Sequence, residues 1–103
     1  MRMMMTISIP TVPGNEGIKS GKMMSLVQKM LAEVKPEATY FIADPQGNRA
    51  GIIVFDMKNS SELPGLAEPW FLGLNAQVHF QPCMTPQDLA AAGPGIEKAV
   101  KES

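Results

Sequence analysis

The residues best suited to chemistry lie in one short segment of the C-terminal half. His79 is the only histidine of the 103-residue chain, and Gln77 and Gln81 flank it at every second position. A neutral imidazole beside amide groups can bind a polar ligand or accept a proton as a general base. Residues 76–82 alternate as a strand does, so these three side chains should share one face. The segment therefore predicts a polar patch centred on His79.

Two hydroxyl groups would extend this patch. Residues 3–9 also alternate, with Thr6 and Ser8 on the more polar side. If this strand neighbours residues 76–82 and the polar sides coincide, Thr6 and Ser8 join His79 in a ligand-binding patch inside a barrel. The alternative is that the polar side faces water or a dimer seam, as is ordinary for a half-exposed strand. The sequence leaves both open.

Glu68 is a second candidate ligand-binding residue, because its carboxylate stands beside Pro69 and two large aromatic residues. Alternatively, it accepts hydrogen bonds from backbone donors that the proline frees. Trp70 has helical spacing from Leu66 and Leu74, which is typical of a core residue.

Other motifs indicate no metal, cofactor or catalytic set. Cys83 is the only cysteine, which rules out an intrachain disulfide and a zinc site built on cysteines of one chain. The glycines before Lys22 lack the spacing of a phosphate-binding loop, and Met23 occupies the position that needs Ser or Thr. Arg49 at the hairpin tip is interpreted as a solvated charge beside turn residues. The nine methionines are typical of adaptable core packing, or of a cavity that accepts several shapes.

Size and charge narrow the class of protein. The length fits one domain spanning residues 1–103, and a net charge of −1 gives no footprint for nucleic acid. The methionine-rich N-terminus is broken by Thr6 and Ser8 and stops at Pro10, so we do not expect a signal peptide. No segment is long and apolar enough to span a membrane. A cytoplasmic location is therefore expected.

Hydrophobic periodicity predicts the elements that position these residues. Turn formers at 44–48 join two β-rich runs into a hairpin over 38–57. Apolar residues at helical spacing predict a helix over 22–34, which Asn15 can cap and whose opening turns Gly17 and Gly21 weaken. A second helix is predicted over 63–74, kinked or split at Pro69. A further helix opens at 85, is interrupted at 93–95 and resumes to 101.

The resulting order predicts an α+β, ferredoxin-like βαββαβ sandwich. Its four-stranded antiparallel sheet would have the order 4-1-3-2, with two helices on one face plus a C-terminal helix. Ile52 to Phe55 are apolar at consecutive positions, which indicates that both faces of the sheet are covered. A second copy of the chain is the simplest cover for the other face, so a homodimer is expected.

Three stretches carry a resemblance to a known family. They are Glu33–Phe41, the Gly-Asn-Arg turn at 47–49, and Ala67–Ala76. Together they resemble small bacterial proteins whose function is not assigned, over Lys22 to Leu89. That family is similar to the dimeric α+β barrel superfamily, in which two ferredoxin-like sheets pack face to face. Members of the superfamily include cofactor-free monooxygenases, isomerases, haem enzymes and effector-sensing modules. The resemblance therefore implies architecture more than function.

Two function hypotheses follow. The first is a non-catalytic homodimer that binds a small molecule or serves as an interaction module. The second is a cofactor-free monooxygenase or isomerase that acts on a small apolar or aromatic substrate, with His79 as its base. A scarcity of titratable groups favours the first, because such chemistry needs a tuned acid or base. The sequence does not identify the ligand.

Overall fold

The computed structural model describes all 103 residues as four strands, five α-helices and one 3₁₀ turn. In chain order they are β1 (Arg2–Ile9), α1 (Thr11–Ser20), α2 (Lys22–Val34), β2 (Ala38–Ala43), β3 (Arg49–Asp56), the 3₁₀ turn η1 (Ser60–Glu62), α3 (Leu63–Leu74), β4 (Gln77–Pro82), α4 (Pro86–Ala91) and α5 (Gly93–Glu102).

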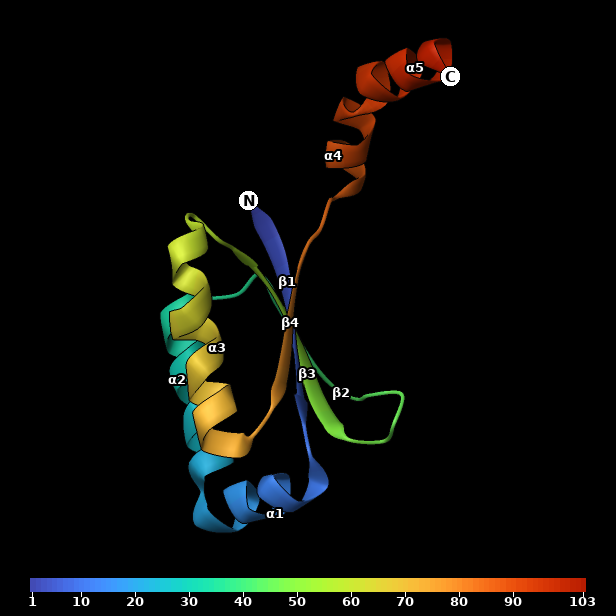
Figure 1. Ribbon diagram of the computed structural model, residues 1–103. Helices are drawn as coiled ribbons and strands as arrows, with labels where there is room; N and C mark the ends of the chain where they lie inside the picture. The colour runs from blue at the N-terminus through green and yellow to red at the C-terminus, as the bar shows by residue number, and fades with distance from the viewer.

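The four strands form one antiparallel sheet with the order β2-β3-β1-β4. This is the order that the sequence predicted, and it is compatible with a ferredoxin-like α+β fold. Helices α2 and α3 lie side by side against one face of the sheet, and α1 lies near the end where β1 finishes (Figure 1). The opposite face carries no helix, and we call it the open face.

The core lies between the sheet and the helices. Alternate residues of β1 are buried, as a strand with one apolar face requires, and Met5 is fully enclosed. Residues at helical spacing on α2 and α3 pack against them, including Met30, Trp70 and Leu74. Trp70 is 3% exposed, which confirms its predicted place in the core.

Two helices differ from the predicted pattern. Helix α1 was not predicted as a separate helix, because Pro13, Gly14 and Gly17 give residues 11–20 a low helix propensity. Gly21, at φ +81°, separates it from α2. Pro69 lies inside a single twelve-residue α3, which η1 precedes with a capping box between Asn59 and Glu62.

The C-terminal helices extend away from the rest of the molecule (Figure 1). The radius of gyration is 16.8 Å, whereas a compact chain of this length has about 13 Å. Neither α4 nor α5 contains a buried residue. We call α4 and α5 the C-terminal arm. None of the helices is of a length and hydrophobicity that would let it cross a membrane.

Candidate functional site

The open face carries five of the six residues predicted to bind a ligand. Thr6 pairs with His79 across β1 and β4, and Ser8 pairs with Gln77. Gln81 pairs with Met4 on the same face. Sheet register therefore brings these polar side chains together, as the alternation of the two strands suggested.

This polar patch is a surface and not a cavity. Gln77, His79 and Gln81 are exposed, whereas Thr6 and Ser8 are half-buried. No hydrogen bond joins any two of the five side chains. None of the five lines the apolar cavity described below, or the smaller one between α2 and α3. In one copy of the chain the patch is thus open to water.

Glu68, the sixth predicted residue, lies elsewhere. It is exposed on α3, which packs against the face of the sheet opposite the polar patch. Its carboxylate makes no salt bridge. The structure therefore separates Glu68 from the other five residues, because helix and patch cover different faces.

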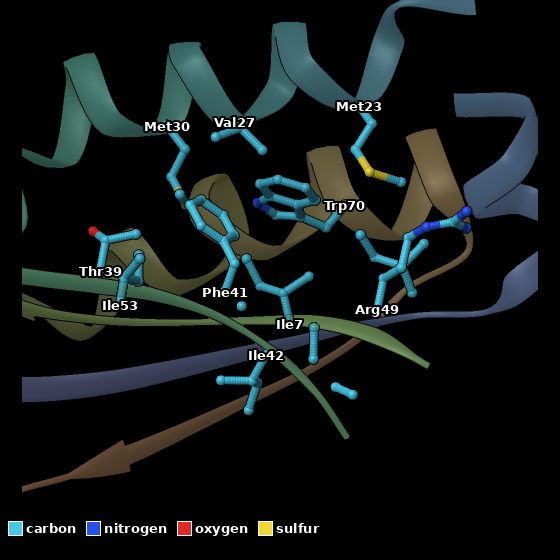
Figure 2. Close-up of a pocket in the computed structure, with 14 residues that line it drawn as sticks. Ile7, Met23, Val27, Met30, Thr39, Phe41, Ile42, Arg49, Ile53 and Trp70 are labelled. Atoms are coloured by element: carbon cyan, nitrogen blue, oxygen red, sulfur yellow. The ribbon is translucent and has the colours of Figure 1, made fainter. Parts of the chain in front are cut away.

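A cavity of about 440 Å³ lies on the helix side of the sheet, between α2 and the β2–β3 hairpin (Figure 2). Eleven of its fourteen lining residues are hydrophobic. The lining residues are Ile7, Ile9, Met23, Val27, Met30, Thr39, Phe41, Ile42, Ala43, Arg49, Ala50, Gly51, Ile53 and Trp70. Its volume is in the range of about 300–1,000 Å³ that small-molecule sites usually have.

Two features of the hairpin leave this space unfilled. Strand β2 is the edge of the sheet, and its Phe41 side chain is 66% exposed although it lies on the helix side. Opposite Phe41 in the sheet is Gly51, which has no side chain to occupy the space. A Cβ atom built at Gly51 would lie 3.6 Å from Phe41 Cδ1, an ordinary van der Waals contact. A Cβ atom would therefore fit at Gly51 without moving its neighbours.

Side chains from both layers surround the cavity in Figure 2. Met23, Val27 and Met30 descend from α2, and Trp70 of α3 lies behind them. Thr39 lies at one end and Arg49 at the other, whereas the Ile42 side chain points away from α2. A ligand would thus meet apolar walls along its length and polar groups at its two ends.

Arg49 is the only charged residue of the lining. Its Nη2 donates a hydrogen bond to Asn15 Oδ1 of α1 at 2.9 Å. No carboxylate lies within 4.0 Å of its guanidinium group. The cavity accordingly offers one cation and one hydroxyl group, and no acid or base that titrates near neutral pH.

Arg49 was interpreted from sequence as a solvated charge, and its place at the cavity was missed. The turn residues before it behave as expected, since Asp44 Oδ1 accepts hydrogen bonds from the backbone N–H groups of Gln46 and Asn48. One available signal was Gly51, because a glycine inside an apolar strand often marks missing side-chain volume.

Comparisons with known proteins agree with the fold. No protein-family model and no curated protein matches the chain. A formyltetrahydrofolate deformylase from Pseudomonas putida KT2440 has a similar structure, with a TM-score of 0.52 and 16% sequence identity. The match covers 81% of this chain and 29% of the deformylase chain, so the chain spans less than a third of that protein's length. At this identity the likeness shows the fold alone.

Proposed function

We propose that the protein is a non-catalytic binding module that holds a small, mainly apolar molecule in the cavity between α2 and the β2–β3 hairpin. The observation that carries this proposal is an apolar cavity of about 440 Å³ between α2 and the β2–β3 hairpin. Empty apolar volume lowers stability, because the lining atoms lose packing contacts. An apolar ligand would restore those contacts.

The residues around the cavity support binding over catalysis. Its lining provides no carboxylate, imidazole or thiol. His79, the base of the enzymatic alternative, lies on the other face of the sheet. General acid–base catalysis requires the base within hydrogen-bond reach of the reacting proton. An enzyme based on His79 would therefore need a different site, between the open faces of two copies.

Trp70 makes the cavity experimentally accessible, because it is the only tryptophan and lines the cavity. Bromine quenches indole fluorescence on contact, so 8-bromo-1-octanol serves as an apolar probe. Saturable quenching of Trp70, reversed by excess 1-octanol, is the expected result. Linear quenching that 1-octanol leaves unchanged would contradict the proposal.

The variant Gly51→Val tests whether the probe occupies the cavity. Its side chain would fill the space beside Phe41, and valine is favoured over glycine in strands. Probe affinity should fall about 4- to 15-fold, since one or two lost methylene contacts are worth about 0.8 kcal/mol each. Thermal stability should remain equal or rise. Equal affinity in a folded Gly51→Val variant would place the probe elsewhere.

We further propose that the open face pairs with the same face of a second copy, as in the dimeric α+β barrel. Tyr40 and Ile42 of β2 are 64% and 42% exposed, and they adjoin Ile52 of β3. Exposed apolar patches of this kind commonly mark interaction surfaces. The charged residues Arg2 and Asp56 pair opposite each other at one end of the face. Arg2 forms ion pairs with Glu37 and Asp88, and Asp56 with the N-terminal ammonium group, so these charges are already paired within one copy.

A further inference from the structure

We propose that the cavity selects molecules with an apolar body and one anionic group, and that Arg49 binds the anion. This inference rests on the proposed function and adds the chemical class of the ligand. The guanidinium group of Arg49 forms no ion pair with a carboxylate of the protein.

Arg49 makes little use of its hydrogen-bonding capacity. A guanidinium group has five N–H donors, and in Arg49 one of them is bonded to a protein oxygen, Asn15 Oδ1. Arg2, by comparison, forms ion pairs with Glu37 and Asp88. The remaining donors of Arg49 are thus available to a carboxylate or phosphate, which guanidinium groups bind in a two-pronged manner.

The position of Arg49 relates this charge to the cavity. Figure 2 shows Arg49 beside Met23 at the α1 end, with the apolar walls extending from it towards Thr39. A ligand lying along α2 would place its apolar body between these walls and its anion at Arg49. Because Arg49 is exposed, the anion would remain near water while the body is buried. The anion would thus keep hydrogen-bond partners, and the apolar body would leave water favourably.

Helix α1 holds the guanidinium group in this place. Asn15 accepts the hydrogen bond from Nη2, and Gly14 allows the close approach. A Cβ atom at Gly14 would lie 2.7 Å from Arg49 Nη1, so any side chain there would displace the guanidinium group. We therefore assign Gly14 and Asn15 as positioning residues for the anion site.

The test compares ligands that differ only in the head group. Nonanoate, octyl phosphate and 1-octanol, which share an eight-carbon alkyl chain, each compete with 8-bromo-1-octanol for quenching of Trp70. In the wild type, at least one anion should bind about 10- to 100-fold more tightly than 1-octanol, as expected for charge-assisted hydrogen bonds. The anion that binds more tightly identifies the head group. In Arg49→Met the ratio of anion to alcohol affinity should fall to about one.

Gly14→Ala provides an independent variant. Displacing the guanidinium group should lower the same ratio several-fold while Arg49 keeps its charge. Gly65→Ala is the matched control, because a Cβ atom at Gly65 of α3 meets nothing within 4 Å. The control should keep the wild-type ratio.

The outcomes separate this inference from the proposed function. If 1-octanol binds as tightly as both anions, the anion site is refuted and the apolar cavity remains. An anion preference that persists in Arg49→Met would also refute it. If none of the three ligands competes with the probe, the proposed function itself fails.

Discussion

Two glycines of α1, Gly14 and Gly17, each lie close to a side chain of another element. Gly14 faces Arg49, whose guanidinium group ends a flexible side chain. Gly17 faces Leu74, a core residue that is 2% exposed and packed among other buried side chains. The same substitution should therefore have different consequences at the two positions.

Gly17→Ala is expected to destabilise the protein. Its Cβ atom would lie 2.5 Å from Leu74 Cδ2, which is too close unless the core shifts. Overpacking costs about 1–3 kcal/mol, and the gain in helix propensity returns at most about 1 kcal/mol. Denaturant unfolding should therefore show a net loss of about 1–2 kcal/mol. Gly14→Ala should lose less, because its closest contact is the end of the Arg49 side chain and its Cβ atom would lie 3.2 Å from Ile9 Cγ2. A Gly17→Ala protein as stable as the wild type would show that α1 does not pack as described.

At this scale the sequence identified one group of residues and missed another. The polar patch was predictable, because alternation alone puts Gln77, His79 and Gln81 on one face. The placement of Arg49 at the cavity was not predictable, because its hydrogen-bond partner Asn15 is 34 positions away on a helix of low intrinsic propensity. Packing between distant elements sets the position of Arg49, and no local sequence pattern indicates it.

At the scale of elements, the C-terminal arm begins at a capped helix end. The Thr85 N–H donates to Asp88 Oδ2 at 2.9 Å, and the Asp88 N–H donates to Thr85 Oγ1 at 3.1 Å. Arg2 Nη1 lies 3.3 Å from the same carboxylate and forms an ion pair between the arm and β1. The hydrogen bonds from the Thr85 backbone and hydroxyl, followed by the charge of Arg2, lower the pKa of Asp88.

This capped end should be sensitive to acid. A lowered pKa means that the carboxylate stabilises α4 above the ordinary value near 4 and that this stabilisation is lost as the pH falls through the lowered value. Amide-exchange protection at the start of α4 should therefore decrease below about pH 4. Asp88→Asn should show weaker protection at neutral pH and little change in this acid range. A wild-type α4 with constant protection down to pH 2 would contradict the assignment.

Periodicity predicted most elements, because β1, β3, α2 and α3 each bury one apolar face. It failed for α1, where burial of Gly14 and Gly17 against neighbouring side chains outweighs weak propensity. Periodicity also did not reveal that the C-terminal arm extends away from the rest of the molecule. An apolar stripe on a helix does not show which element packs against it.

At the scale of the whole molecule, the open face should bring two copies together. Light scattering at micromolar concentration should give twice the chain mass of 11.1 kDa. Ile52→Asp would place an unpaired charge in that interface and should yield monomers or unfolded protein. Only Ile52 serves this test, because Ile53 lies in the core at 1% exposure.

Ile18→Asp is the control for this experiment, since Ile18 is exposed on α1, away from the open face. It should keep the wild-type mass. A wild type that is folded and monomeric at these concentrations would refute the dimer. The cavity proposal would be unaffected, because every lining residue used in it comes from one chain.

The most direct test of the cavity uses the methionines as reporters of position. Met23 and Met30 line the cavity, Met4 lies on the open face, and Met84 lies before the C-terminal arm. With ¹³C-methyl methionine, NMR can follow all four methyl groups during a titration with 1-octanol. Saturable shifts are expected at Met23 and Met30, with Met4 and Met84 unchanged. Shifts confined to Met4 or Met84, or no shift at Met23 and Met30, would contradict binding in the cavity.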